Sequence, residues 1–562
     1  MAETTPSASA TGSVTTTATA TTSTATSANP PTLTSLPSGG KKVVIDPVTR
    51  IEGHLRVTCV VENGKVTDAW NTATQFRGFE IFMKDRDPRS CWQFAQRICG
   101  VCPTPHAHAS VLATEHAMGL KNVPDGARLF RNMSEAAHIG YDHILWFYLL
   151  NAFDYVNVPN GLKAKVPATQ PALKALQDTV RRIVESGQLG PFAGHWWDHP
   201  GYKNPPEVDL ELTAHYLRAI EVQQFANDAS AFMGGRFPMV MNYQPGGMIN
   251  QPTIEELQYY KGQMSRVTDF VDNVMLPDLL TIAPLYLDLA TIGAGHKNYL
   301  SWGIFDDESQ DPYNRVLPRG AIFGGDLTSV QKVDPMEDVK IFTKSSYYSD
   351  SSGEGKHPLD AGQDVKFTSY PDLKGDKLPD GKYDWTQSAR LGKDNRPMEV
   401  GPLAEVLVAY ASGRAEVKAL VDSTLAAVGA AGKPEILMSD LGRIAGRVLR
   451  AKLNSDFAQK WADDFLGLVK AGKAEVYKEP PSPNDGEGAG GWNAPRGALA
   501  HYIRIKGGKT SAYAAVPPTN WNLSPRDDNG VRGPLEAALI GTPVVDPTKP
   551  LEILRVVHTF DP

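Results

Sequence analysis

The chain has 562 residues, of which 41% are hydrophobic, and a formal net charge of −7. That is enough apolar material for a large buried core. The small acidic excess and the lack of a basic stripe argue against nucleic-acid binding. No unbroken apolar run of about 18 residues is visible, so we expect no direct membrane span.

The cysteines are few and unevenly placed. There are four, and three of them fall between positions 91 and 102; the full set is Cys59, Cys91, Cys99 and Cys102. A chain of this size does not need a disulfide framework. The crowding is typical of a reducing compartment in which the close pair serves a metal or a redox function.

The first 40 residues have low complexity. Thr, Ser and Ala dominate residues 1–40, and Glu3 is the only charged residue there. Such a segment cannot form a core, so we expect it to be disordered. It lacks the basic and apolar regions of a secretory signal and the arginines of a transit peptide. We expect one folded domain over residues 41–562.

Strand patterns come first along the folded part, at 43–45 and 55–60, with a hairpin turn predicted at Asn63-Gly64. Two helices are expected between 90 and 151, and others at 168–186, 207–232, 254–291, 403–428 and 435–471. Residues 300–400 are rich in Asp, Gly, Ser and Pro and predict an irregular excursion. A second β region is expected around 501–505 and 513–516. The fold class is therefore α+β, mainly helical, with a central helical bundle and peripheral β regions.

The candidate chemistry begins at Cys99-Gly100-Val101-Cys102. Two cysteines three apart can turn both sulfurs to one side and hold one soft metal. Thr104 and Pro105 are typical of an N-cap and a first helical residue, which would place Cys102 just before a helix. Amide groups at such a position favour thiolate over thiol. His106 lies within reach of the same site.

The spacing alone leaves several kinds of site open. A structural zinc module needs a second ligand pair about 12–20 residues away, and His108 and His116 do not make a standard one. A thioredoxin-like pair would follow a strand in a βαβ unit, and no such unit is visible. The CxxC spacing therefore indicates metal or redox function and does not choose between them.

A series of motifs then identifies a family. The motifs, in chain order, are Asp46–His54, Arg77–Glu80, Arg97–Cys102, Arg396–Leu403, Ala494–Gly497, and Trp521-Asn522 with Pro525–Asp527. Together they resemble the large subunit of nickel-iron hydrogenases over nearly all of 41–562. The resemblance implies the hydrogenase large-subunit fold and reversible heterolytic cleavage of H2, chiefly in the direction of H2 uptake. Met239 stands where many relatives have His, which suggests a divergent branch.

The resemblance implies a bimetallic Ni–Fe centre held by four thiolates, with CO and cyanide on the iron. Cys99 would be terminal on nickel, and Cys102 would bridge nickel and iron, as suits soft thiolates. Glu80 and the backbone carbonyl of Ala515 would bind a hard second metal, Mg2+. His106 would hydrogen-bond a cysteine sulfur.

Further site residues are implied by the same motifs. Arg496 would lie over the open coordination site and polarise H2. Asp142 and Asp561 would hold the Arg496 side chain in place. Glu52 would begin the proton exit path. Pro495 and Thr519 would line the cofactor, with the Thr519 hydroxyl bonded to a cyanide.

Electrons need a route outside this chain. Cys59 and Cys91 are the only other cysteines, too few for a four-cysteine iron–sulfur cluster. We therefore expect an obligate heterodimer with an iron–sulfur small subunit that carries all the clusters, or a higher oligomer of such heterodimers. Maturation proteins would install the metals. We expect the chain in the cytoplasm, either free or held at the membrane through its partners.

Two related kinds of protein and an inactive paralogue are alternatives to this assignment. A complex I quinone-site relative shares the fold but has lost the cysteines, so Cys99 and Cys102 count against it. A regulatory, H2-sensing hydrogenase has the same site and differs in turnover rate. An inactive paralogue would lack the remaining thiolates.

The carboxyl end gives one more expectation. The family motif is Asp-Pro-Cys-x-x-Cys-x-x-His, and Asp561-Pro562 match its first two positions. Selenocysteine, encoded by UGA, replaces the first of those cysteines in selenium-containing members. We expect the natural protein to continue after Pro562 with selenocysteine, two residues, cysteine, two residues and histidine; a shortened chain is the alternative. Any codon other than UGA after Pro562 would contradict the selenium hypothesis.

Overall fold

The computed structural model describes residues 33, 35–193, 195–362, 364–365 and 375–562. Most of the tail expected to be disordered, residues 1–32 and 34, lies outside the described residues. The described part of that tail lies against the folded domain. The backbone N–H of Leu33 donates to Asp68 over 3.1 Å, and Leu33 and Leu36 pack against Trp70.

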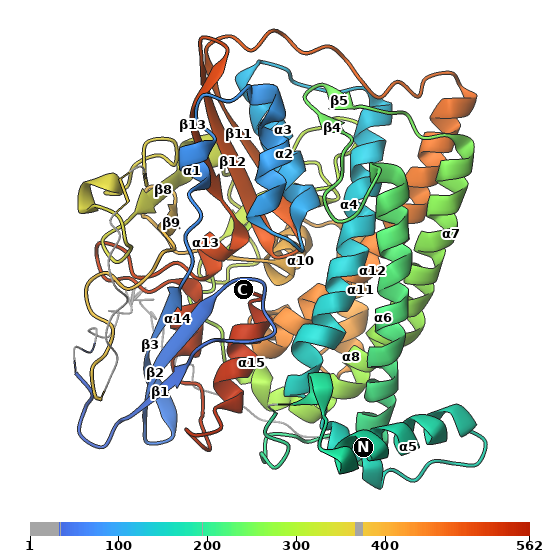
Figure 1. Cartoon of the computed structure of the whole chain (residues 1–562), viewed down its shortest axis with the longest axis vertical. Helices are drawn as coiled ribbons and strands as arrows, with labels where there is room; N and C mark the ends of the chain where they lie inside the picture. Colours follow the sequence, from blue (N-terminus) through green and yellow to red (C-terminus); the bar gives the residue numbers. More distant parts are fainter. Residues whose placement is uncertain (1–32, 34, 194, 363, 366–374) are drawn as a thin grey trace, which may run out of the picture. The chain divides into compact units, whose positions relative to one another are not determined.

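Long helices form the larger part of the domain (Figure 1). They are α3 (Pro103–Ala117), α4 (Asp125–Leu145), α6 (Pro206–Gly234), α7 (Ile254–Phe270), α10 (Pro402–Ala411) and α12 (Asp440–Lys470). Helix α4 packs against α6 and α12, and α7 packs against the same two helices, which closes a four-helix arrangement around one apolar core. Side chains cap two of these helices: Thr253 and Glu256 form a capping box on α7, and Ser439 caps α12.

The other α-helices of the described chain lie outside this four-helix arrangement. They are α1 (Phe79–Phe82), α2 (Cys91–Ala95), α5 (Pro171–Ser186), α8 (Leu276–Ile282), α9 (Pro335–Asp338), α11 (Ala415–Ala427), α13 (Pro518–Asn522), α14 (Pro534–Leu539) and α15 (Leu551–Thr559). The last two pack with the first sheet into a separate small core, so the C-terminal residues return to the start of the folded chain.

The strands form small peripheral sheets. Three sheets have three strands: β1 (Lys41–Ile45), β2 (Leu55–Glu62) and β3 (Lys65–Ala73); β10 (Glu399–Val400), β6 (Tyr299–Ile304) and β7 (Leu317–Ile322); and β11 (Gly486–Ala494), β12 (Gly497–Lys506) and β13 (Lys509–Val516). The described residues also form two strand pairs: β4 (Tyr243–Gln244) with β5 (Gly247–Met248), and β8 (Val339–Phe342) with β9 (Ser388–Leu391). The predicted fold class, α+β and mainly helical, is confirmed.

The predicted hairpin turn is present between β2 and β3. Asn63 and Gly64 have φ angles of 50° and 73°, the positive values that a tight hairpin turn of this kind needs. Residues 300–400, predicted as an irregular excursion, contain β7, β8 and β9 as short strands separated by long loops.

The sequence analysis missed β11, the strand that fixes the position of α3. Its sequence begins Gly-Glu-Gly-Ala-Gly, and glycine disfavours strands, so no strand was predicted there. Gly486, Gly488 and Gly490 alternate along one face of the strand, and a Cβ atom on any of them would overlap a backbone carbonyl oxygen of α3. The missing side chains therefore let the helix backbone lie directly on the sheet.

Replacing Gly490 with alanine is expected to destabilise the domain by about 1–3 kcal/mol, because the new methyl group would overlap the carbonyl oxygen of Ala109 and displace α3. Gly467→Ala in α12 is the matched control, since nothing lies within 4 Å of its Cβ position. There the helix should gain up to roughly 1 kcal/mol. Denaturant unfolding of both variants checks the difference, and equal stabilities would contradict this packing.

One helical stretch meets the composition of a membrane span. The stretch Ile254–Thr291, which includes α7 and α8, has a mean hydropathy of 1.3 in its most apolar window, and 39% of that window is buried within the domain. No span was expected from the sequence because it has no unbroken apolar run of about 18 residues. A mean hydropathy over a window can be high even when polar residues interrupt the stretch. The core helix of a compact protein meets the same criterion, so this is weak support for a span.

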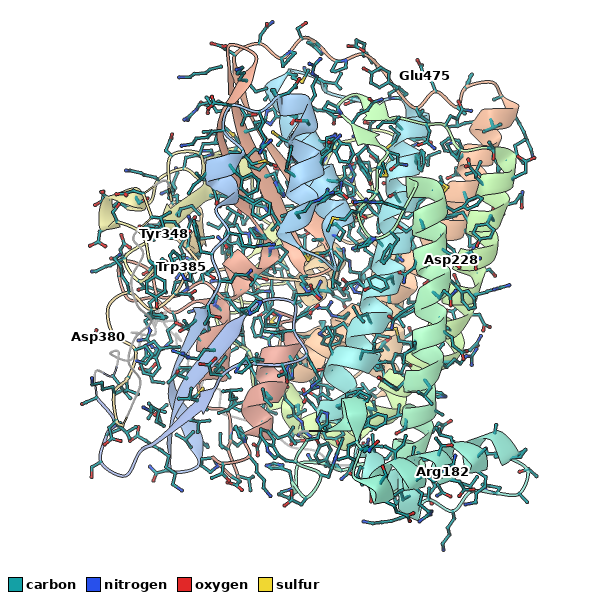
Figure 2. The ribbon with its side chains drawn as sticks, viewed as in Figure 1. Arg182, Asp228, Tyr348, Asp380, Trp385 and Glu475 are labelled. Atoms are coloured by element: carbon teal, nitrogen blue, oxygen red, sulfur yellow. A yellow bond between two sulfur atoms is a disulfide. The ribbon has the colours of Figure 1, made fainter. Side chains whose placement is uncertain are left out.

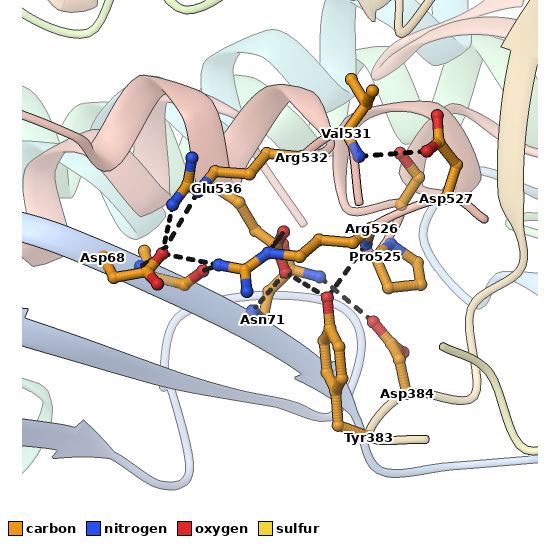
Figure 3. Close-up of polar contacts among 12 residues, drawn as sticks. Asp68, Asn71, Tyr383, Asp384, Pro525, Arg526, Asp527, Val531, Arg532 and Glu536 are labelled. Carbon is orange, nitrogen blue, oxygen red and sulfur yellow. Dashed lines mark hydrogen bonds and ion pairs between the residues drawn. The ribbon is translucent and has the colours of Figure 1, made fainter. Parts of the chain in front are cut away.

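A buried polar cluster ties the first sheet to the C-terminal part (Figure 3). Asp68 on β3 accepts from Arg526 over 2.5 Å and from Arg532 over 2.7 Å. The Tyr383 hydroxyl donates to Glu536 over 2.9 Å, and burial raises the pKa of Glu536 to about 7. Removing one member of such a cluster would leave buried charges unpaired, so these segments are held together firmly.

Candidate active site

A cavity of about 340 Å³ gathers most of the predicted site residues from distant parts of the chain. Its lining includes Glu52, Cys99, Cys102, His106, Arg496, Thr519 and Pro562. The sheet β1–β3, the start of α3, the turn between β11 and β12, and the end of the chain after α15 converge here (Figure 1). The motifs that the sequence separates by more than 450 positions thus form one site.

The cysteine pair lies at the N-terminus of α3. Cys102 is the N-cap residue and Pro103 the first helical residue, so the helix begins two residues earlier than predicted. Pro103 suits the first helical position for the same reason that Pro105 would. A proline has no backbone N–H, and the N–H of a first helical residue has no partner within the helix. The Cys102 backbone N–H donates to the Cys99 sulfur over 3.0 Å, a contact that would favour the thiolate once the pair is reduced.

The two sulfurs of the pair meet at one point. Cys99 and Cys102 are joined as a disulfide, with Cα atoms 5.4 Å apart. A pair that can close in this way can also direct both thiolates at one soft metal ion. Among the described residues, no group of three or more His, Cys, Asp and Glu side chains is arranged to hold a metal. The described side chains therefore do not form the closed four-ligand site of a structural zinc module.

Arg496 is clamped by two carboxylates. It lies in the turn between β11 and β12, is 4% exposed, and pairs with Asp142 over 3.0 Å and with Asp561 over 3.1 Å. Although burial opposes it, the two carboxylates raise the pKa of Arg496, so the guanidinium stays charged. Two ion pairs fix the planar fork in one orientation.

A residue that sequence analysis missed supports this clamp. Arg447 on α12 pairs with Asp561 over 2.8 Å and donates to the Pro495 carbonyl over 3.3 Å. Its guanidinium also lies 4.3 Å from the centre of the Trp146 ring. Arg447 therefore holds Asp561, a carboxylate partner of Arg496, and also Pro495, which precedes Arg496 in the chain.

The sequence of α12 contains a pattern that indicates this role of Arg447. Arg443, Arg447 and Arg450 recur on one face of α12, and all three are buried. The two flanking arginines pair with Glu399 and Glu405, each over 2.8 Å. Arginines at helical spacing within a predicted core helix indicate buried acidic partners, because unpaired buried charge is costly.

Glu52 lies beside the end of the chain. Its backbone N–H donates to the Pro562 carbonyl over 3.0 Å, and its side chain faces the cavity. Burial raises the pKa of Glu52, while Arg496 opposes the rise. A carboxyl group with a raised pKa is protonated more readily than an exposed one, which suits a role in proton transfer.

His106 lines the cavity from the first turn of α3. Its Nδ1 atom is hydrogen-bonded to Nε2 of His501 over 2.9 Å. Burial, with a smaller contribution from Arg77, lowers the pKa of His106 to about 3, so the ring is neutral. The predicted bond to a cysteine sulfur remains a prediction.

A second cavity of about 180 Å³ contains the residues predicted for the second metal. Glu80 and Ala515 both line it, and it shares the walls Arg77 and Ile98 with the cysteine site. Tyr348 and Trp385 also line it, and Figure 2 labels these two side chains close to each other. Burial raises the pKa of Glu80, so a cation beside it would stabilise the ionised form.

These features define a class of protein. A thiolate pair for a soft metal, set beneath an arginine that two carboxylates immobilise, is the arrangement of a metal-dependent redox enzyme. The family model "Nickel-dependent hydrogenase" matches residues 77–562, and "HoxL-like" matches residues 42–76. The chain belongs to the nickel-dependent hydrogenase family: it is the large subunit of a nickel-iron hydrogenase, an oxidoreductase.

Individual relatives agree along almost the whole length. The chain is 37% identical to the hydrogenase-2 large chain of Escherichia coli K12, over 93% of this chain and 96% of that one. It is 37% identical to the uptake hydrogenase large subunit of Rhizobium leguminosarum bv. viciae, over 94% and 95%. Among solved structures, the Ni-Fe-Se hydrogenase from D. vulgaris Hildenborough superposes with a TM-score of 0.77 and 31% identity, covering 93% of this chain and 98% of that one.

Proposed function

We propose that this chain is the catalytic large subunit of an H2-uptake hydrogenase that passes electrons to an iron–sulfur small subunit. The observation that carries the proposal is the pair Cys99 and Cys102 in one cavity with the doubly clamped Arg496. Relatives named as uptake hydrogenases, 37% identical over nearly the full length, support the direction of H2 uptake.

Cys99 and Cys102 supply two of the four thiolates that the resemblance implies for a Ni–Fe centre, so the described residues fit that centre in part. When bound, that centre, whose iron we expect to carry CO and cyanide, would supply the site at which H2 is cleaved heterolytically and oxidised, giving in total two protons and two electrons. Cys99 and Cys102 would hold it through their sulfurs, and Pro495 and Thr519 would contact its diatomic ligands. Arg496 presents a fixed positive charge to the cavity and stabilises negative charge that develops there, without any reorganisation of its own.

Glu52 is the group that we propose takes the proton away. It lines the same cavity as the cysteines and Arg496, and burial keeps its pKa raised. A raised pKa makes this carboxylate a stronger proton acceptor than an exposed one. Its bond to Pro562 fixes the backbone on which this carboxyl group is carried.

Glu80 and the Ala515 carbonyl are proposed to hold Mg2+ in the neighbouring cavity. A carboxylate and a backbone oxygen are the ligands that this hard cation prefers. The shared walls Arg77 and Ile98 would couple this site mechanically to the cysteine pair.

The electron route requires the partner. Cys59 and Cys91 are both buried and pack in different apolar clusters, so they cannot join the site cysteines in one iron–sulfur cluster. We therefore propose an obligate heterodimer, or an oligomer of heterodimers, with all iron–sulfur clusters in the small subunit. Maturation proteins would load the metals, and the complex would work in the cytoplasm or at the membrane through its partners.

Purification of the chain with its co-expressed small subunit tests this proposal. We expect about one nickel per large subunit and H2-dependent reduction of an external dye. The large subunit purified alone should give no dye reduction, because it has no electron route. A nickel-loaded complex that reduces no dye under H2, or an isolated chain that does so, would contradict the proposal.

A further inference from the structure

Trp146 is a buried aromatic residue at the end of α4 to which neither the family motifs nor the proposed function assigns a role. It begins the π-helical turn Trp146–Asn151, which continues α4. Its indole Nε1–H donates to the backbone carbonyl of His558 over 3.1 Å, and the guanidinium of Arg447 lies 4.3 Å from the centre of its ring. Trp146 is not among the described residues that line the cysteine cavity, so any influence on the site passes through these two partners.

Both contacts of Trp146 lead to Asp561. The His558 carbonyl that accepts from the indole also accepts from the Asp561 backbone N–H, over 3.0 Å. Arg447, which lies on the indole ring, pairs with the Asp561 carboxylate over 2.8 Å. Trp146 therefore supports the backbone of Asp561 through one contact and its side chain through the other.

The backbone of Asp561 needs such support. Its φ angle is 53°, in the left-handed region. Aspartate tolerates this region better than most residues, but the residue before a proline is normally extended, with φ near roughly −120°, and Pro562 follows directly. A conformation that the local sequence disfavours persists only where surrounding contacts hold it. The contacts of Asp561 with Arg447 and with the His558 carbonyl are of this kind.

The same end of α4 reaches Arg496 by two routes. Asp142, one helical turn before Trp146, pairs with Arg496 directly over 3.0 Å, and Asp561 pairs with the same guanidinium over 3.1 Å. We propose that Trp146 is a positioning residue that holds Asp561 in place and so keeps the second of the two carboxylates on Arg496. The consequence for H2 oxidation rests on the proposed function, whereas the conformation of Asp561 is a property of this chain.

Crystal structures of the purified complex with Trp146→Leu and with Trp146→Phe test the structural part of this inference. Leucine removes both contacts, so we expect Asp561 to leave the left-handed region and its carboxylate to separate from Arg447. Phenylalanine keeps a ring beneath Arg447 but cannot donate to the His558 carbonyl. We therefore expect the ion pair to remain and the Asp561 backbone to occupy two conformations. Asp561 in its single wild-type conformation in both variants would overturn the inference.

Turnover for each bound nickel tests the functional part. We expect kcat for H2 oxidation per nickel to fall roughly tenfold in Trp146→Leu and about threefold in Trp146→Phe, the orders set by losing a cation–π contact with a hydrogen bond and by losing the hydrogen bond alone. The KM for H2 should stay within about twofold, because Trp146 does not line the cavity. Adding Arg447→Gln to Trp146→Leu should cost less than the product of the two single effects, because both residues act on Asp561.

Trp70→Leu is the matched control. Trp70 on β3 is also buried and lies 4.8 Å from a guanidinium, that of Arg526, but it belongs to a different apolar cluster. We expect its kcat per nickel to stay within about twofold of the wild type, as for a site without shared partners. An equal loss in Trp70→Leu, an unchanged kcat in both Trp146 variants, or a double variant that loses the full product would overturn the inference. A wild-type complex that oxidises no H2 would count against the proposed function, and the crystal structures would still decide whether Trp146 positions Asp561.

Discussion

Replacing Arg496 with lysine is expected to lower kcat for H2 oxidation by roughly 10²–10³-fold, the loss typical of removing one preorganised electrostatic group. The guanidinium reaches Asp142 and Asp561 at the same time, over 3.0 and 3.1 Å. A lysine ammonium keeps the charge but not the planar fork, so it cannot hold both contacts in this geometry. Steady-state H2 oxidation by the purified complex measures the effect.

The nickel content should stay within about twofold of the wild type, because Arg496 does not belong to the cysteine pair. Arg504→Lys is the matched control: it lies on β12, where it pairs with Glu487 and Asp360 near the surface, and surface pairs contribute little. A kcat for Arg496→Lys close to that of Arg504→Lys would contradict the role assigned to the clamped guanidinium.

Replacing Cys99 with serine is expected to remove nickel from the complex, lowering bound nickel by roughly tenfold or more, because a hydroxyl is a poor ligand for a soft metal. The Cys102 backbone N–H donates to the Cys99 sulfur, which would favour the thiolate of the reduced pair. A serine would stay protonated there. Metal analysis of the purified complex gives the nickel content directly.

Cys91→Ser is the control for this change. Cys91 is buried, lies 3.4 Å from the Thr510 hydroxyl and is not part of the cavity. Burial raises the pKa of its thiol to about 11, as expected of an inert structural cysteine. Its serine variant should bind nickel normally. Full nickel in Cys99→Ser would show that the metal lies elsewhere.

The sequence predicted the long helices because apolar residues recur at helical spacing over many turns. It predicted the first hairpin because Asn63-Gly64 has one favoured turn. It failed at β11, where the glycines that look hostile to a strand are required by the close approach of α3. At β11 the intrinsic preference of glycine disfavours a strand, whereas the packing of α3 requires glycine. The packing determines the structure that forms.

The site residues were predicted from motif resemblance, whereas the helices were predicted from the spacing of apolar residues. Motif resemblance named Arg496 and Asp561, but nothing in either motif shows that they form an ion pair or that Arg447 supports both. The same holds for His106, whose hydrogen bond to His501 joins residues 395 positions apart. The spacing of the α12 arginines indicates buried acidic partners but not which residues these are, because the partners depend on how α3, α12 and the β11–β13 sheet pack.

The formation of HD by the nickel-loaded complex under D2 in ordinary water is the most direct measurement of heterolytic cleavage at this site. Mass spectrometry follows it, and no electron acceptor is needed. Heterolysis gives a deuteron that exchanges with solvent, so we predict that HD forms in the wild-type complex and does not form in Cys99→Ser. A nickel-loaded wild-type complex that releases no HD would contradict the assignment of this cavity as the place where H2 is cleaved.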